Sequence, residues 1–340
     1  MKWYIATGAE NDVVVSSRIR LARNLKNYPF VNRMDETGVR ACTKTVFDAA
    51  QKSGNPLVSN LSFIEMDSLS DTDAAVLLER HLISPEFANE RGGRGLILRE
   101  SDDAVSIMVG EEDHIRIQVM RPGLALDDAY HEAEAIDNLF DQNLTYAFNG
   151  KLGFLTQCPT NLGTGLRASV MLHLPALERS GALNKLASTL PKLGLTIRGT
   201  YGEGTKAQGA FYQLSNQVTL GISEKTAIDN LKGITTQIIA QERAARDILA
   251  KQPAALEDSV FRALGTLQNA RLLSGAEFLS EFSLVRLGVS MGLIQTVSLE
   301  TLGALLADCT AAALIQKAGH ALSEEERDIA RATAVRSALA

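Results

Sequence analysis

The sequence predicts an α+β fold, in which a mainly antiparallel sheet flanked by helices is followed by a small all-helical domain. Short strand-like segments joined by short turns recur as far as Leu214, which is typical of antiparallel strands. After Ser223 there is no convincing strand, and Pro253 interrupts a long helical stretch. We therefore expect one domain over residues 1–253 and a helical domain over residues 254–340.

The strands are predicted from apolar, β-branched runs and from alternation of apolar and polar residues. Val13–Val15 forms such a run, and His114–Met120 alternates as a half-buried strand should. The other strand candidates are 63–66, 95–99, 105–109, 154–157, 169–174, 195–200 and 211–214.

The helices are predicted from amphipathic spacing and from the residues at their ends. Asp71 is expected to cap a helix that runs to His81, and Ser53–Pro56 should end the helix before it. The first domain should contain helices at about 35–51, 71–81, 125–141, 176–190 and 224–251. The second should contain helices at about 256–273, 275–290, 298–317 and 323–338.

The composition narrows the functional classes. The chain has 340 residues, 45% of them hydrophobic and 22% charged, which is ordinary for a globular protein. A net charge of −6 argues against a nucleic-acid partner, although arginines could still build a local basic site. Three scattered cysteines without CxxC spacing fit a reducing compartment. With no signal-peptide core and no apolar stretch long enough to span a bilayer, we expect a cytoplasmic protein without a membrane partner.

Three segments carry arginines in short motifs: Ser16–Arg20 with two serines, Glu111–Arg116 with three carboxylates, and Cys158–Arg167 with a thiol and two glycines. Arginine forks bind phosphate oxygens bidentately and remain charged at any relevant pH. In a strand, Arg18 and Arg20 would share one face. By the same rule Glu112, His114 and Arg116 would line one site, unless Glu111–Asp113 is only a solvated acidic turn.

Gly163–Ala168 also satisfies the dinucleotide fingerprint G-x-G-x-x-A. That fingerprint requires a buried strand before it and a helix after it. Here Cys-Pro-Thr-Asn precedes the glycines and the β-leaning Val170–Leu174 follows them. Dinucleotide binding is therefore the weaker interpretation, and no Walker A sequence is present.

Together the three segments resemble the signature of the guanidino (phosphagen) kinases, which transfer a phosphoryl group from ATP to a guanidinium nitrogen. The resemblance extends through Ile197–Gly204, where it is closer to the bacterial protein arginine kinases, and covers roughly residues 13–225. It implies the guanidino kinase catalytic fold, ATP as phosphoryl donor and Mg²⁺ arriving with it. The ligands that it implies for the nucleotide phosphates are Arg18, Arg20, His114, Arg116, Arg167 and Arg198.

On the guanidinium side, the resemblance implies Glu112 as catalytic base and Glu203 as a second carboxylate. A guanidinium is a poor nucleophile, so its phosphorylation requires carboxylates that orient it and accept a proton. Cys158 resembles the cysteine that lies beside the guanidinium in this family; the plainer alternative is a buried structural thiol. Cys42 and Cys309 are expected to be core residues.

Two features favour arginine in proteins over a small guanidino compound. The Ser-Ser-Arg motif begins at Ser16, which leaves no room for the helical domain that precedes it in the small-metabolite kinases. Near the C-terminus, Arg327–Ala332 is similar to the RDxxRA element linked in protein arginine kinases to allosteric phosphoarginine binding. On a helix Arg327, Asp328 and Arg331 would share one face. The segment Glu242–Asp247 has the same composition, however, so this signal alone is weak.

The main expectation is therefore an ATP-dependent kinase of protein arginine. The resemblance further implies marking of proteins for a Clp ATPase–protease, a role in stress response, a zinc-binding activator protein and a homodimer formed through the C-terminal domain. The alternatives are a kinase for free arginine or another small guanidino compound, and a catalytically inactive module that binds phosphoarginine. The intact set of arginines and glutamates argues against the last.

Overall fold

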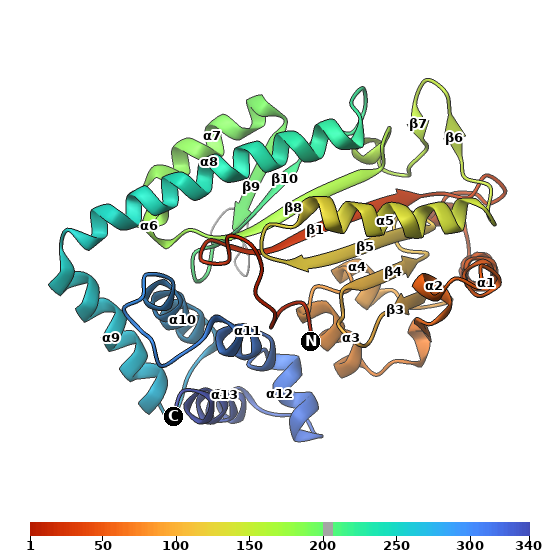
Figure 1. The fold of residues 1–340 in the computed structure, drawn as a ribbon. Helices are drawn as coiled ribbons and strands as arrows, with labels where there is room; N and C mark the ends of the chain where they lie inside the picture. Colours follow the sequence, from red (N-terminus) through yellow and green to blue (C-terminus); the bar gives the residue numbers. More distant parts are fainter. Residues whose placement is uncertain (200–206) are drawn as a thin grey trace.

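A computed structural model of the chain describes residues 1–199 and 207–340. Its centre is an eight-stranded sheet in the order β2-β3-β4-β5-β1-β8-β10-β9, with all neighbouring strands antiparallel (Figure 1). The predicted antiparallel sheet is thus confirmed. The strands are β1 (Val14–Arg23), β2 (Ser62–Glu65), β3 (Gly95–Leu98), β4 (Val105–Val109), β5 (Ile115–Pro122), β8 (Leu166–His173), β9 (Leu195–Gly199) and β10 (Phe211–Asn216).

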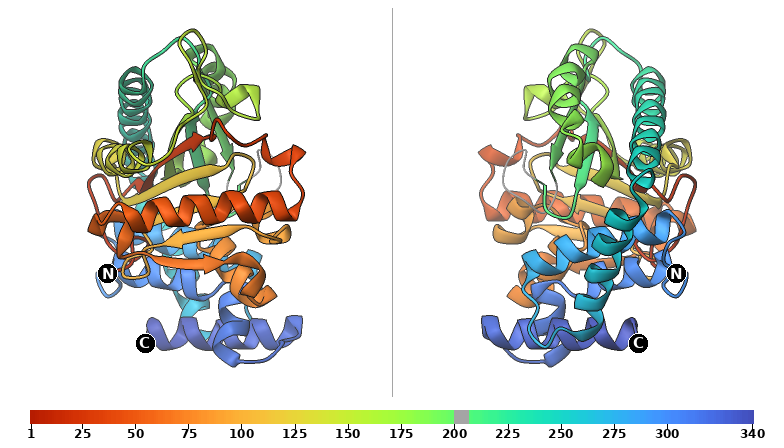
Figure 2. Two further views of the ribbon diagram at one scale, coloured as in Figure 1. Left: turned by 90° about the vertical axis from the view of Figure 1, so that its right-hand side faces the viewer. Right: turned by 90° about the vertical axis from the view of Figure 1, so that its left-hand side faces the viewer.

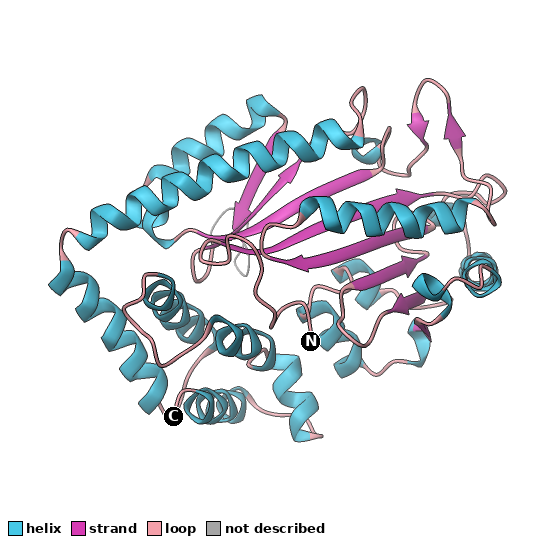
Figure 3. Ribbon diagram, viewed as in Figure 1, coloured by secondary structure: helices cyan, strands magenta, loops and turns pink. Residues whose placement is uncertain are grey.

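The helices surround this sheet and then continue without strands to the C-terminus (Figure 3). In the first domain they are α1 (Glu36–Lys52), α2 (Pro56–Ser59), α3 (Asp71–Glu79), α4 (Pro85–Asn89), α5 (Leu126–Asp141), α6 (Pro175–Arg179), α7 (Ala182–Thr189) and α8 (Glu224–Ala250). The C-terminal helices are α9 (Pro253–Asn269), α10 (Gly275–Ser290), α11 (Leu299–Asp308), α12 (Ala311–Ala318) and α13 (Glu324–Ala338).

Several elements differ from the prediction for local reasons. The segment 298–317 is two helices, because Thr310 starts α12 anew, and α11 and α12 meet at 76°. The segment 176–190 breaks at Gly181, whose φ of +74° lies in the left-handed region that favours glycine. Ser70, one residue earlier than expected, caps α3 by accepting from the Asp73 amide. Phe154 belongs to a separate hairpin of β6 (Phe148–Asn149) and β7 (Gly153–Phe154), outside the main sheet.

The two faces of the sheet serve different purposes. Ile19, Leu21 and Val170 pack with α5 and α8 in the larger hydrophobic core. Residues that alternate with them in β1 and β8 point to the opposite face. In Figure 1 α5 and α8 lie above the sheet and the C-terminal helices lie below it, and both side views in Figure 2 keep those helices at the lower end.

The C-terminal helices share a core with this lower face. Phe211 of β10 is fully buried in the same cluster as Phe278 and Phe282 of α10, and Met171 of β8 packs against it. A polar contact adds to the apolar one, because the Glu79 carboxylate accepts the Ala312 backbone N–H at 2.9 Å. Glu79 of α3 thereby caps the first turn of α12.

None of the described helices is by itself both long and apolar enough to cross a membrane. The bent pair α11 and α12 reaches that length and composition only when the two helices are counted together.

Candidate active site

Four arginines project from neighbouring strands onto the lower face of the sheet. Arg18 and Arg20 alternate with buried apolar residues of β1, as predicted, and Arg20 lies directly opposite Arg167 of β8. Arg198 sits near the end of β9. The four arginines are therefore Arg18, Arg20, Arg167 and Arg198. None of them forms an ion pair in the part of the chain that the structure describes.

Burial, and then crowding by like charges, lowers the pKa values of three of these arginines. Burial, and then the charges of Arg167 and Arg116, lowers the pKa of Arg18 to about 10. Burial and the neighbouring arginines likewise lower the pKa values of Arg20 and Arg167. The hydrogen-bond partners of Arg18 are uncharged. Arg18 donates to Gln213 Oε1 at 2.7 Å and to Ser169 Oγ at 3.3 Å. Like charges held together without carboxylates favour a multiply charged anion.

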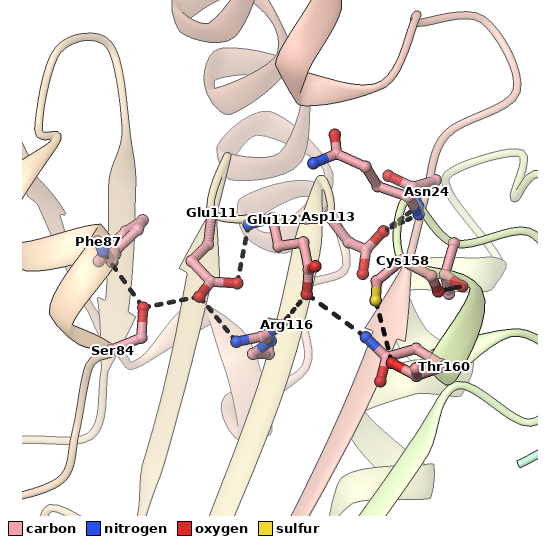
Figure 4. A network of polar contacts seen from close by, with 12 residues as sticks. Asn24, Ser84, Phe87, Glu111, Glu112, Asp113, Arg116, Cys158 and Thr160 are labelled. Atoms are coloured by element: carbon pink, nitrogen blue, oxygen red, sulfur yellow. Dashed lines mark hydrogen bonds and ion pairs between the residues drawn. The ribbon is translucent and has the colours of Figure 1, made fainter. Parts of the chain in front are cut away.

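A turn of acidic residues lies at the end of this cluster, just before β5 (Figure 4). Arg116 donates from Nη1 to Glu111 Oε1 at 2.7 Å and from Nη2 to Glu112 Oε2 at 3.0 Å. Burial raises the pKa of Glu112. The negative charges of Asp113 and Glu111 raise it further, and the positive charge of Arg116 opposes the shift. The turn therefore joins a half-buried carboxylate with raised basicity to the edge of the cationic cluster.

Cys158 approaches the same carboxylate from the loop before β8. Its side chain is half-buried, its Sγ lies 3.0 Å from Thr160 Oγ1, and it interacts with the Glu112 carboxyl group. Asn161, in the same loop, reaches Glu112 Oε2 at 3.5 Å. The thiols of Cys42 and Cys309 are buried in the core, and burial raises the pKa of each to about 12.

The glycines after this loop bring two backbone segments together. Gly163 has a φ of +108°, and a Cβ placed there would lie 2.3 Å from the Thr219 carbonyl oxygen. Only glycine fits such a position. The residues that follow form strand β8 and no helix, so the segment lacks the strand–glycine–helix arrangement of a dinucleotide site.

His114 does not join the predicted site. Strand β5 begins only at Ile115, so the alternation expected for residues 112, 114 and 116 does not apply. The ring is 0% exposed, and Nδ1 accepts the Leu25 backbone N–H at 2.9 Å while Nε2 lies 2.8 Å from the Pro29 carbonyl oxygen. Both ring nitrogens are therefore used to hold backbone, which argues against the predicted role as a nucleotide ligand.

Sequence reasoning missed three neighbours of the site. Glu111 is 5% exposed and bonds Arg116 and the Glu112 backbone N–H. Gln213 accepts from Arg18. His81 has a φ of +59°, and burial together with Arg18 lowers its pKa to about 4. Glu111 lay within a recognised motif, whereas no sequence signal marked Gln213 or His81.

Two cavities adjoin these residues. One of about 650 Å³ is lined by Glu111, Glu112, Arg116 and further acidic residues, including Glu36 and Glu86. The other, of about 300 Å³, is lined by Arg18, Arg198, His81, Ser169 and Gln213. Glu203 lies outside the described residues. Within those residues no group of three His, Cys, Asp or Glu side chains is arranged to hold a metal ion.

The C-terminal candidate residues occupy α13. Arg331 is 5% exposed and donates to Asp328 Oδ1 at 2.7 Å, to the Leu273 carbonyl at 2.7 Å and to the Cys309 carbonyl at 2.9 Å. It also lines a cavity of about 540 Å³ between the two domains, together with Glu79 and His81. Arg327 and Asp328 are half-buried on the same helix.

Two family models match the chain, one in each of its two parts. Residues 42–245 match the ATP:guanido phosphotransferase C-terminal catalytic domain, and residues 253–340 match the protein-arginine kinase McsB C-terminal domain. The second match begins at the first residue of α9.

Curated relatives align over nearly the whole chain. A protein-arginine kinase of Halothermothrix orenii is 46% identical over 99% of this chain and 96% of its own length. One of Brevibacillus brevis is 42% identical over 99% of this chain and 94% of its own length.

Solved structures share the catalytic fold. The duplicated taurocyamine kinase from Schistosoma mansoni, with bound transition state analog components, has a TM-score of 0.61 at 27% identity. The alignment covers 70% of this chain and 34% of that one. Lombricine kinase also gives a TM-score of 0.61, at 24% identity over 71% of this chain and 69% of its own, and this likeness concerns the fold alone.

The two family models and the full-length relatives together show that the chain is a member of the protein-arginine kinase family, an ATP:guanido phosphotransferase with an additional C-terminal domain.

Proposed function

We propose that this enzyme transfers the γ-phosphoryl group of ATP to arginine side chains of proteins, and that the residues named above carry the reaction. The observation that carries this assignment is the position of Glu112 beside Arg116, at the margin of an arginine cluster without counter-charges in the described chain. A triphosphate supplies the missing negative charge, and a guanidinium fits the carboxylate.

Each cavity has the character needed by one substrate. The cavity of about 300 Å³ beside Arg18 and Arg198 would take the nucleotide, with Arg20 and Arg167 adding charge to its phosphates. The cavity of about 650 Å³ beside Glu112 would take the arginine side chain, because its lining is rich in carboxylates. Phosphoryl donor and acceptor would then meet beside the Arg116–Glu112 pair.

In the proposed reaction a guanidinium nitrogen attacks the γ-phosphorus, and the bond to the bridging oxygen of ADP breaks. The proton lost from that nitrogen passes to the Glu112 carboxylate, whose raised pKa suits a base. Glu203 is proposed as the second carboxylate on the guanidinium, and the Cys158 thiol as its neighbour. Arginines on the γ-phosphoryl oxygens stabilise the charge that spreads over them in the transition state.

Mg²⁺ would be bound mainly by the phosphates and by water. Magnesium usually retains several of its waters and needs few ligands from the protein when it binds with a nucleotide. Magnesium would neutralise phosphate charge and align the triphosphate, while the arginines named above would hold the triphosphate to the protein.

The biological setting is proposed from the family. We expect a cytoplasmic homodimer that is stimulated by a zinc-binding activator protein, marks proteins for a Clp-type protease and acts in stress response. The match of residues 253–340 to the McsB C-terminal domain supports this setting.

We also propose that Arg327, Asp328 and Arg331 form an allosteric phosphoarginine site. Replacing Arg327 and Asp328 with alanine should leave basal transfer intact and remove stimulation by free phosphoarginine. Allostery requires phosphoarginine to bind one state of the enzyme more tightly than the other. Identical dose–response curves for wild type and the double variant would leave these residues with a structural role in α13 alone.

The decisive test is the location of the product. The enzyme should be incubated with ATP and Mg²⁺, together with free arginine and an unfolded protein that contains arginine. We expect acid-labile phosphate on arginine residues of the protein. Label on free arginine alone would favour the small-guanidino kinase, and no label with retained phosphoarginine binding would favour the inactive module.

A further inference from the structure

The side chain of Ser84 contacts the acidic turn that contains Glu111 and Glu112, although Ser84 itself lies outside that turn (Figure 4). Ser84 is the N-cap of α4, and its Oγ accepts the Phe87 backbone N–H at 3.2 Å. The same hydroxyl donates to Glu111 Oε1 at 2.7 Å. One side chain thus starts a helix and bonds a buried carboxylate at the same time.

Glu111 uses both carboxylate oxygens inside the site. Oε1 accepts from Ser84 and from Arg116 Nη1, and Oε2 accepts the Glu112 backbone N–H at 2.8 Å. Since the bond from Ser84 selects the orientation of Oε1, it also aims Oε2 at the Glu112 amide. The orientation of this one carboxylate therefore bears on both Arg116 and Glu112.

The segment before Ser84 is itself held firmly. Gln118 of β5 donates to the His81 carbonyl at 2.8 Å, and Ser106 of β4 donates to the Leu82 carbonyl at 2.7 Å. The side chains of Leu82 and Ile83 are buried, and Pro85 occupies the first turn of α4. Two central strands thus fix the position from which the hydroxyl donates.

We propose that Ser84 is a positioning residue of the kinase, which holds the Glu111 carboxylate so that Arg116 and Glu112 keep their catalytic arrangement. This inference rests on the function proposed above, in which Glu112 is the base. Ser84 lines neither of the two cavities proposed for the substrates, and it acts through Glu111. Its loss should therefore lower turnover more than it weakens binding of either substrate.

Three substitutions separate the hydroxyl from the helix cap. Ser84→Thr keeps both the cap and the donor, whereas Ser84→Gly keeps a tolerable N-cap and removes the donor. Ser298→Gly is the matched control, because Ser298 caps α11 by accepting the Thr301 N–H and lies outside the site. For Ser84→Gly we expect a loss of about tenfold in kcat, the size expected for a hydrogen bond to a charged group, with little change in KM.

The conservative and control variants should behave differently. Ser84→Thr should retain turnover close to that of wild type, and Ser298→Gly should keep both its kcat and most of its stability. Equal turnover in wild type and Ser84→Gly would overturn the proposal, as would equal losses in Ser84→Gly and Ser84→Thr. Failure of the proposed function looks different, because wild type itself would then form no phosphoarginine in the protein substrate.

A second measurement requires no turnover. The Glu112 amide hydrogen is bonded to Glu111 Oε2, so its exchange with solvent reports the orientation of that carboxylate. Exchange should be about tenfold faster in Ser84→Gly than in wild type, and unchanged in Ser84→Thr and Ser298→Gly. Identical exchange in all four proteins would exclude a positioning role, whatever substrate the enzyme phosphorylates.

Discussion

Arg167 and Arg23 come from adjacent strands of one sheet, but their surroundings are opposite. Arg23 of β1 forms a bidentate pair with Asp137, donates to the Thr164 carbonyl and lies 3.6 Å over the ring centroid of Phe154. Arg167 of β8 faces Arg20, and its Nε has no hydrogen-bond partner among the described residues. The fixed arginine joins parts of the fold, whereas the unpaired one is left for a ligand.

The energetic consequence follows from charge compensation. Removing the carboxylate partner of a buried arginine is strongly destabilising, because it leaves a buried charge without compensation. Clustered arginines without carboxylates are mutually repulsive until an anion arrives. Stability and catalysis should therefore respond to different arginines, and the following variants are chosen to separate these responses.

The largest effect should come from Glu112→Gln. The substitution keeps the shape of the side chain and removes the group that accepts the proton, so kcat should fall by roughly 10²–10⁴. ATP affinity should change little, because the sheet arginines hold the phosphates. Turnover and nucleotide affinity measured on the same preparation check both statements, and near wild-type turnover would show that Glu112 is not the base.

Removing an unpaired arginine should come next. Arg167→Ala and Arg198→Ala should each lower kcat/KM for ATP by about 100-fold, since one fork is lost from a charge-dense site. The ligand-free protein should lose little stability, because repulsion is relieved. The control is Arg262→Ala, which removes an exposed arginine paired with Asp258 on α9. Unchanged ATP affinity and rate in both site variants would mean that the nucleotide site has been misplaced.

The opposite pattern is expected for the fixed arginine. Asp137→Ala leaves Arg23 buried without its carboxylate and should cost about 3 kcal/mol in unfolding free energy. Asp258→Ala, at the exposed pair, should cost less than about 1 kcal/mol. Denaturant unfolding measures both. If Asp137→Ala proved as stable as wild type, the contrast between the two kinds of arginine would lose its energetic basis.

The smallest expected effect is a displacement of the pH profile. The pKa of Glu112 is raised, mainly by burial, so the base becomes protonated at a higher pH than an ordinary glutamate. Activity should fall as pH decreases through that raised pKa, because a protonated carboxyl group accepts no proton. The acid limb of kcat/KM should therefore lie above the usual glutamate range. A limb at or below that range would contradict this environment for Glu112.

Much of this contrast could be predicted from the sequence. The spacing of Arg18 and Arg20 indicated one face of a strand, and the residues of β1 confirm it. Spacing failed for His114, because strand alternation holds only inside a strand and β5 starts one residue later. The sequence predicted both groups of charged residues in the site, but not which arginine each carboxylate would bind.

Composition alone could not tell which of two arginine-rich helix segments, Glu242–Asp247 or Arg327–Ala332, would bind a ligand. Glu242 and Arg246 of α8 are buried and paired at 2.9 Å, and Glu242 also accepts the Leu177 backbone N–H at the start of α6. Arg331, in the segment predicted to bind phosphoarginine, is equally buried and bonds backbone carbonyls. Such partners come from residues distant in sequence, so no local pattern reveals them.

The shared core around Phe211 has a consequence for how this protein can be divided. A fragment that ended near Pro253 would expose Phe211 and leave Glu79 without the Ala312 amide that it caps. The exposed aromatic surface would invite self-association, and the sheet would lose part of its support. The two sequence families matched by this chain are therefore not interchangeable modules, and we expect gene fusions or truncations at this junction to require compensating changes in β10 and α3.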